Sequence, residues 1–324
     1  MTGSSTHNSV LFDANGTDRA GIALSDLNVE RLESTQLLWV DCQDMAAFEA
    51  VQARLGIPES LTKAACVHDD QPAVLNTTEH FWIRVFSLSI DTSAQIDNYQ
   101  LDIVAGRNVV ITIGRSKSSG TPELMSRPDC DTALGRLDAA SFVAAILHRL
   151  LTTYFDAVAE IEDHVERIDQ IILDPRHVDC TDELRRLLRA TAQVRKRLAR
   201  HRIVFSTLAR PDFSPADQGD RRKHFAALDD KYERAMDVAE DSRDLVVDCF
   251  ELFSSRTALD TNRTMRTLTF LTVLIGALAV TAGVLGMNFQ VGFFSSEIGF
   301  WITIAVMLLM SIAAWWLASR KQWT

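Results

Sequence analysis

The sequence lacks closely spaced cysteines and the residue patterns of a catalytic centre. Its five cysteines include no C-x-x-C pair and are scattered at Cys42, Cys66, Cys130, Cys180 and Cys249. An odd, dispersed set predicts reduced thiols, and no metal site follows from it. The sequence also shows no nucleophile–base arrangement and no ATP-binding motif. These absences argue against an enzyme.

Charge is absent from two long stretches near the C-terminus. No Lys, Arg, Asp, Glu or His lies between Arg266 and Glu297, and none lies between Glu297 and Arg320. Each stretch is long enough to cross a hydrocarbon core of roughly 30 Å as a helix. Neither alternates as the strand of a membrane barrel would. We therefore predict two transmembrane helices, at 268–287 and 298–317, joined by a short outer loop.

Positive charges flank these two predicted spans on one side only. Arg263 and Arg266 precede the first span. Arg320 and Lys321 follow the second span, whereas the loop between the spans has no Lys or Arg. The positive-inside rule then places both termini in the cytoplasm and the loop outside. Because the N-terminus has no apolar core of a signal peptide, we expect a multi-pass protein of the inner (plasma) membrane.

The part of the chain before the spans is strongly acidic. The whole chain carries a net charge of −10, and residues 263–324 carry +3, so residues 1–262 carry −13. Such an excess of negative charge argues against a nucleic-acid partner and favours cations.

Residues 21–130 predict a cytoplasmic α/β domain, preceded by a polar, turn-rich segment at 1–20 that predicts disorder. Strand-like patterns occur at 37–41, 81–90, 101–105 and 109–113. The last two predict a hairpin, because the turn between them contains Gly106 and Asn108. The pattern at 81–90 does not reveal which face is buried. A helix is predicted at 44–55, where Gly56 ends it.

Residues 131–266 predict cytoplasmic helices and a stalk, and residues 267–324 predict the membrane region. Two helices are expected at 139–173 and 181–209. From Asp220 to Ile275 there is no Gly and no Pro, and apolar residues recur about every 3.5 positions. We favour a single stalk helix that bundles with copies of itself. The alternative is a bent pair of helices packed within one subunit.

Small or weakly polar residues continue this spacing into the first span. They are Asn262, Met265, Thr269 or Thr272, Gly276, Ala279, Gly283 and Gly286. Small residues line the interfaces between membrane helices, which is one explanation. The other is a narrow pore that leaves room for a hydrated ion. Because two helices cannot enclose a pore alone, ion passage would require a ring of subunits.

The stretch Gly286-Met287-Asn288 at the outer end of the first of two C-terminal spans resembles the CorA family of divalent-cation transporters. The resemblance extends over nearly the whole chain. It implies an α+β cytoplasmic domain, a long stalk helix and two C-terminal transmembrane helices, assembled as a helical homopentameric funnel. In that family the motif forms the outer mouth of the pore. The residues after the motif, from Gln290 onward, depart from the usual Met-Pro-Glu-like continuation, and this leaves the subfamily open.

The resemblance assigns roles to residues of the first span and its outer end. Asn288 of each subunit would present an amide oxygen to the water shell of the entering cation. Gly286 would let the loop backbones pack closely. Met265 and Leu268 would form a hydrophobic constriction. The remaining expected pore-lining residues are Glu251 and Asn262 at the inner entrance, then Thr272, Gly276, Ala279 and Gly283.

Three acidic residues outside the span are further candidates. Glu297 is the only acid of the outer loop. Asp229 and Asp230, on the stalk, could join a regulatory cation site at a subunit interface of the kind that the resemblance implies.

The expected function is passage of a hydrated divalent cation, with magnesium favoured and cobalt and nickel also passing. Residues 267–319 contain no Cys, His or Asp, so they offer a stripped zinc ion no thiolate or imidazole and offer no imidazole to relay protons. One alternative is a proton-coupled zinc transporter of the ZntB branch. Another is a membrane-anchored cation sensor or scaffold without transport. The expected partners are copies of the chain and lipid, with no organic cofactor.

Overall fold

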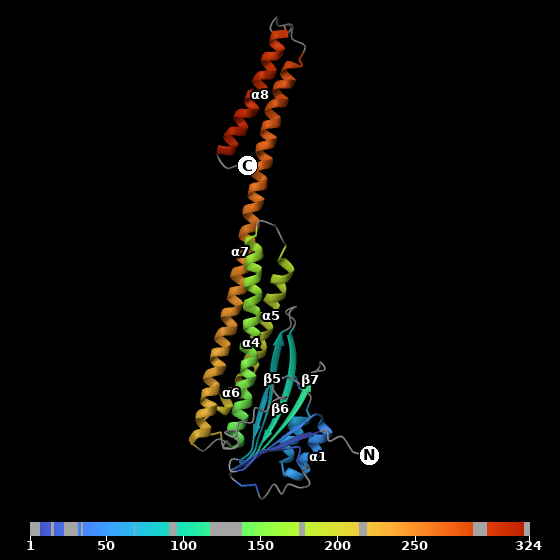
Figure 1. Ribbon diagram of the computed structural model, residues 1–324, viewed down its shortest axis with the longest axis vertical. Helices are drawn as coiled ribbons and strands as arrows, with labels where there is room; N and C mark the ends of the chain where they lie inside the picture. The colour runs from blue at the N-terminus through green and yellow to red at the C-terminus, as the bar shows by residue number, and fades with distance from the viewer. Residues whose placement is uncertain are drawn as a thin grey trace. The chain divides into compact units, whose positions relative to one another are not determined.

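The computed structural model describes residues 7–13, 16–22, 32–33, 35–67, 69–90, 96–116, 138–174, 179–213, 219–287 and 297–320. The chain divides into two compact units, Met1–Cys249 and Phe250–Thr324, called unit 1 and unit 2 below. Unit 1 contains a mixed sheet and the helices that cover it, and unit 2 contains the apolar C-terminal helices (Figure 1). The predicted fold class is confirmed, while the homopentamer stays a prediction.

The sheet of unit 1 has seven strands in the order β2-β1-β3-β7-β6-β5-β4. The strands are β1 His7–Asp13, β2 Arg19–Ala20, β3 Gln36–Cys42, β4 Ala73–Asn76, β5 Phe81–Ile90, β6 Ile96–Ala105 and β7 Val109–Ser116. Only β3 and β7 pair in parallel among the described strands. The predicted hairpin is confirmed, with Ala105 opposite Val110 across the turn.

The prediction of disorder at 1–20 is wrong for the two strands that lie there. Val10, Leu11 and Phe12 of β1 are buried, and β1 pairs with β3 along its whole length. This apolar run is short and lies within a polar segment. The mean composition of residues 1–20 therefore does not reveal it.

Both faces of β5 are buried, which explains why its sequence did not indicate one. Residues 81–88 are all buried. Phe81 packs against Phe213 and Phe225, with ring centroids 5.4 and 6.4 Å apart. Trp82 belongs instead to the core formed with α1 (Met45–Leu55) and α2 (Glu59–Cys66). A strand covered on both faces is not expected to alternate.

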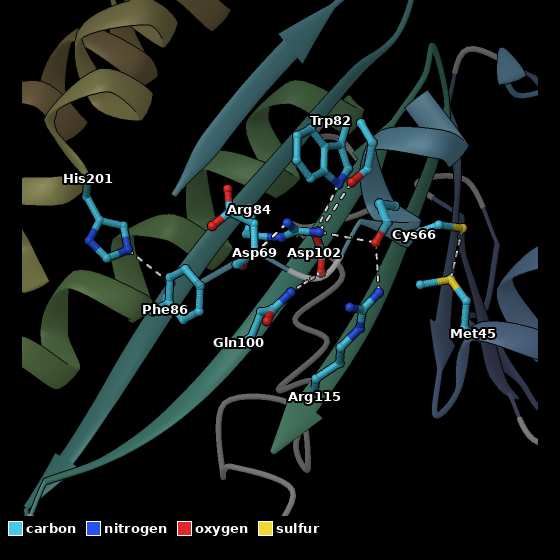
Figure 2. Close-up of polar contacts among 12 residues, drawn as sticks. Met45, Cys66, Asp69, Trp82, Arg84, Phe86, Gln100, Asp102, Arg115 and His201 are labelled. Carbon is cyan, nitrogen blue, oxygen red and sulfur yellow. Dashed lines mark hydrogen bonds and ion pairs between the residues drawn. The ribbon is translucent and has the colours of Figure 1, made fainter. Parts of the chain in front are cut away.

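A buried ion pair connects β5 to β6 on the α2 side of the sheet (Figure 2). The Arg84 Nε donates to Asp102 Oδ1 at 2.9 Å, and both side chains are almost completely buried. Trp82 Nε1 and Gln100 Nε2 also donate to this carboxylate, at 3.1 and 2.7 Å. Burial raises the pKa of Asp102, and Arg84 opposes that shift. The buried Asp102 carboxylate is therefore shielded from water and accepts hydrogen bonds from three side chains.

The same guanidinium also holds the C-terminal end of α2. Arg84 Nη2 donates to the carbonyl oxygens of Ala64 and Ala65, at 3.3 and 3.1 Å. Arg115 Nη2 donates to the Ala65 carbonyl as well, at 2.7 Å. Carbonyl groups in the last turn of a helix have no amide donor within that helix, so the two arginines supply the missing donors.

The helix boundaries follow from capping residues. The Asp44 side chain accepts from the Ala47 amide at 2.7 Å, and Gly56 ends α1 in the left-handed region with φ 66°. Asp138 accepts in the same way from Ser141, at 2.9 Å, and starts α4 (Ala139–Leu173). Short side-chain acceptors at the N-cap satisfy amides that the first turn leaves unpaired. The prediction of a helix at 139–173 is confirmed.

The single helix predicted at 181–209 is instead two helices, α5 (Thr181–Arg200) and α6 (Arg202–Leu208), separated by His201. The His201 ring is buried and contacts two backbone groups, one of which belongs to Phe86 (Figure 2). Its Nε2 accepts from the Phe86 amide at 2.9 Å, which assigns the proton to Nδ1, and Nδ1 donates to the Arg197 carbonyl at 2.9 Å. Burial lowers the pKa of His201 to about 4, so the ring is neutral at physiological pH.

The helix α7 (Gly219–Leu285) is one continuous element, so the bent pair is excluded. Its apolar stripe, however, is buried inside unit 1, at Phe225, Leu228, Tyr232, Ala235, Ala239, Ser242, Val246 and Cys249. Tyr232 stacks on Phe205 of α6 with ring centroids 5.0 Å apart. The prediction that these residues bundle copies of the chain is therefore wrong. A 3.5-residue spacing fits a helix partner from the same chain as well as one from a copy.

Candidate ion pathway

The two C-terminal helices are apolar and exposed. Three described helices, α4, α7 and α8 (Glu297–Arg320), are long and apolar enough to cross a membrane. Half of the most apolar window of α4 is buried, whereas none of that of α7 and 6% of that of α8 is buried. The apolar residues of α4 are thus accounted for by the core of unit 1. The most apolar windows of α7 and α8 stay largely exposed within the chain and match the two predicted spans.

Within unit 2, α7 and α8 pack on each other through one face each (Figure 1). The partly buried residues of α7 between 268 and 284 are Phe270, Leu274, Leu278 and Thr281. On α8, Gly299 is buried, and Thr303, Met307 and Ala314 are among the partly buried residues. Both sets repeat every three or four residues, as one side of a helix does.

The small-residue stripe lies on the opposite side of α7. At about 100° per residue, the positions of Met265, Thr272, Gly276, Ala279 and Gly283 centre about half a turn away from the face that meets α8. All five residues are exposed in this chain. The predicted pore-lining positions therefore share one uncovered face.

The glycines of this stripe are not required by contacts within the chain. A Cβ added at Gly276 or at Gly283 would meet nothing within 4 Å, and neither residue has a positive φ. Side chains are therefore absent where the single chain leaves ample space. Close approach by another helix or by an ion path is the physical reason left for them.

The hydroxyl groups of the stripe are bonded to the helix itself. Thr272 Oγ1 donates to the Leu268 carbonyl at 2.8 Å, and Thr269 Oγ1 donates to the Met265 carbonyl at 2.8 Å. This arrangement uses the hydroxyl proton and leaves oxygen lone pairs pointing outward. Such oxygens can accept from the water shell of a cation.

The inner end of the stripe combines apolar and polar side chains. Met265 and Leu268 are 64% and 63% exposed. Asn262 and Glu251 are also exposed, one and four turns further from the motif. The predicted constriction and inner entrance thus occupy the uncovered part of α7.

The motif begins where α7 ends. The Gly286 amide donates to the Ala282 carbonyl at 2.9 Å, and the Met287 amide donates to the Val284 carbonyl at 3.3 Å. These two residues close the last helical turn, and the Met287 side chain is 55% exposed. Asn288 lies outside the described residues. Glu297 is the exposed first residue of α8, where a negative charge is favourable at a helix N-terminus.

The two acidic residues of α7 in unit 1 do not form a metal site alone. Asp229 is half-buried and Asp230 is exposed. Burial, followed by the charges of Glu233 and Asp230, raises the pKa of Asp229. In the described parts of the chain no group of three or more His, Cys, Asp or Glu side chains could hold a metal ion. A regulatory cation there would need ligands from elsewhere, so this site stays a prediction.

Two features of unit 1 were not expected from the sequence. One is the Arg84–Asp102 pair, for which the only signal was an arginine in an apolar run. The other is a cavity of about 290 Å³ beside α5, lined by Lys196, Arg197 and Arg200. The sequence indicates this cavity only through the spacing of the three cations, which places them on one side of a helix. That spacing did not enter the sequence-based prediction.

The chain matches known proteins over most of its length. A family model described as CorA-like Mg2+ transporter protein matches residues 34–320. The cobalt/magnesium transport protein CorA of Thermotoga maritima is 21% identical over 71% of this chain, which spans 66% of that protein's length. The divalent cation transporter CmaX of Pseudomonas aeruginosa is 25% identical over 97% of this chain and 95% of its own.

The fold is also that of a solved member of this group. The CorA magnesium transporter of Methanocaldococcus jannaschii has a TM-score of 0.74 to this chain at 18% identity, with 98% of each chain covered. At this identity the likeness shows the fold alone. The family model, in contrast, covers far more than half of the sequence. The chain therefore belongs to the CorA-like family, whose members are membrane transporters of divalent cations and not enzymes.

Proposed function

We propose that copies of this chain assemble into a membrane pore that passes a hydrated divalent cation, with Mg²⁺ as its physiological ion and Co²⁺ and Ni²⁺ also passing. The observation that carries the proposal is the exposed stripe opposite α8, where Gly276 and Gly283 leave space that the chain itself does not use. Since one chain supplies only two spans, a ring is needed to enclose a path. Family resemblance implies five copies.

The proposed pathway runs along the stripe. Asn288 at the outer mouth would accept hydrogen bonds from water bound to the cation, and Thr272 would offer hydroxyl oxygens further in. Mg²⁺ sheds its water reluctantly and prefers oxygen, so neutral oxygen ligands suit a hydrated ion. Met265 and Leu268 would close the path when the ring narrows there and water leaves it.

Transport in liposomes tests this proposal directly. We expect purified protein to admit Mg²⁺ down its electrochemical gradient, with Co²⁺ and Ni²⁺ competing and no acceleration by an imposed proton gradient. The stripe variant Ala279→Leu should reduce this flux at least tenfold, because each copy adds a bulky side chain to a narrow path. The matched variant Ala282→Leu adds the same atoms on the flank of the helix and should retain most of the flux.

Three outcomes of the same assay would contradict the proposal. Entry of Zn²⁺ without competition from Mg²⁺, accelerated by a proton gradient, would favour a zinc transporter of the ZntB kind. Absence of flux for every divalent cation, from protein that is folded and oligomeric, would favour a membrane-anchored sensor or scaffold. Equal effects of the two leucine variants would remove the stripe from the pathway.

We also propose that both ends of the chain face the cytoplasm and that the loop after α7 faces outward. The basis is the placement of Arg263, Arg266 and Arg320 on one side of the two helices. A cysteine placed at Ser295, which lies outside the described residues, should react in intact cells with a membrane-impermeant thiol reagent. A cysteine placed at Thr324 should react only after the cells are opened. Labelling of Thr324→Cys in intact cells would overturn this topology.

A further inference from the structure

The cavity beside α5 is a candidate ligand site in unit 1 that transport does not explain. It has a volume of about 290 Å³ and lies between α5, the strands β5 and β6, and the segment at 70–72. This volume is close to the lower end of the range of about 300–1,000 Å³ that small-molecule pockets occupy. The cavity can therefore hold a small metabolite.

The charge of its wall is opposite to that of the chain. Lys196, Arg197 and Arg200 come from one side of α5, and the cavity brings them together in a chain of net charge −10. No ion pair within 4.0 Å involves any of the three among the residues that the structure describes. Arg195 and Arg202, by contrast, pair with Glu240 and Glu233 of α7, at 3.5 and 3.0 Å. The three unpaired cations repel one another, and an anion between them would relieve that repulsion.

One of these cations is partly withdrawn from water. Arg197 is half-buried, and its burial lowers the pKa of the guanidinium. An arginine in this setting binds an anion more strongly than one in open solvent. The carboxylate of Asp70 also lines the cavity, but it is exposed, so water screens its repulsion of an anion.

Two further residues that line the cavity, His201 and Phe86, carry no charge and are held in place by their contacts. His201 is neutral and uses both ring nitrogens, one on the Phe86 amide (Figure 2) and the other on the Arg197 carbonyl. The Phe86 ring meets the His201 ring edge to face, with centroids 6.2 Å apart. These contacts lock the backbone beneath Arg197 and present an aromatic surface to the cavity. An occupant can therefore combine an anionic group with an apolar ring.

A second polar group in the cavity has no partner. Asn98 Oδ1 is buried and lacks a hydrogen-bond partner among the described residues. A buried acceptor without a donor costs free energy unless a ligand or water supplies one. If the Asn98 side chain turns toward the cavity, a hydroxyl group on the occupant can donate to this oxygen.

We propose that this cavity binds a small organic phosphate, whose phosphate group lies between Lys196, Arg197 and Arg200 and whose hydroxyl-bearing remainder reaches Asn98 and Phe86. Guanidinium groups match phosphate oxygens in pairs, and the lysine adds a point charge. Free inorganic phosphate shares the anionic part of this chemistry but not the remainder. The two sources can therefore be separated by affinity.

Calorimetric titration of the full chain in detergent, in metal-free buffer, tests the site. The probes are adenosine 5′-monophosphate and inorganic phosphate, with chloride at equal ionic strength as the reference. We expect both phosphates to bind and the nucleotide to bind more tightly. The double variant Arg197→Gln/Arg200→Gln should weaken binding by about tenfold or more, the loss expected for two charge-assisted contacts.

A matched variant removes the same charge from the same helix outside the cavity. Arg185 and Arg189 are exposed on α5 and do not line the cavity. Arg185→Gln/Arg189→Gln should bind both probes within twofold of the unchanged chain. Lys196→Gln, at an exposed position, gives a variant whose folding is not at risk and should weaken binding in the same direction as the double variant. Thermal unfolding without probe confirms that each variant is folded.

The possible results separate cleanly. Equal affinity for the two probes, lost in the cavity variants, would overturn the organic part of the proposal and assign the anion site to free phosphate. Heats no larger than those of chloride for both probes would overturn the proposal. Binding that survives in the cavity double variant, or that the matched variant weakens equally, would also overturn it. None of these results depends on ion flux. The binding experiment therefore tests the cavity proposal independently of the pore proposal.

Discussion

Uptake of Mg²⁺ by liposomes that contain the Asn288→Ala variant is expected to fall to the level of protein-free liposomes, while the variant still assembles as the unchanged chain does. The physical reason is the proposed role of the amide oxygen, which replaces hydrogen bonds from bulk water to the water shell of the entering ion. Alanine offers no acceptor, so the hydrated cation meets an apolar rim. Flux and oligomer size, measured on the same preparation, check the prediction.

Gln290 provides the matched control for this substitution. It carries the same amide group two residues further along the outer loop, and like Asn288 it lies outside the described residues. Gln290→Ala should leave most of the flux intact. If Asn288→Ala transports normally, the residue serves only to end α7, as asparagine often does at helix C-termini.

The second large effect is expected for Asp102, in unit 1. Asp102→Ala should lower the free energy of unfolding by about 3–5 kcal/mol, because it leaves the Arg84 guanidinium buried without its counter-charge. In a unit of this size that corresponds to a fall of roughly 6–20 °C in Tm. The loss should also free the end of α2, whose last carbonyls Arg84 holds.

Thermal unfolding of the full chain in detergent, followed by circular dichroism, measures this effect. Asp97→Ala removes an exposed carboxylate from the same strand and should change Tm little. The paired substitution Arg84→Met/Asp102→Leu removes both charges together and should recover most of the loss. A double variant as unstable as Asp102→Ala would show that the network is needed for reasons other than charge pairing.

The sequence was most informative where a local signal decides the structure. The charge-free stretches located the two apolar helices, because five residue types are missing from them together. The C-terminal end of α4 follows from Asp174-Pro175, because a proline and the residue before it disfavour continuation of a helix. The hairpin formed by β6 and β7 follows from Gly106 and Asn108 in the turn between them. Each of these signals lies within a few residues of the boundary that it sets.

What the sequence could not supply is the partner of a residue far away in the chain. Arg84 and Asp102 are 18 residues apart, and Phe86 and His201 are 115 apart. The apolar stripe from Phe225 to Cys249 indicates that one face of the helix is covered, but it does not indicate which helix covers it. The sequence-based prediction assigned this face to copies of the chain, whereas the structure covers it with residues of the same chain. The stripe around Gly276 has the same ambiguity, and there the single chain leaves the face open.

The parallel pairing of β3 with β7 also sets an order of events while the chain is being made. Leu38 pairs with Val109, so the sheet cannot close until the ribosome has passed β7. The first charge-free stretch begins about 150 residues after the end of β7, which takes on the order of 8–30 s at about 5–20 residues per second. The strands therefore have time to close into a sheet before the apolar segments emerge. The insertion machinery then receives a chain whose N-terminal sheet has already formed.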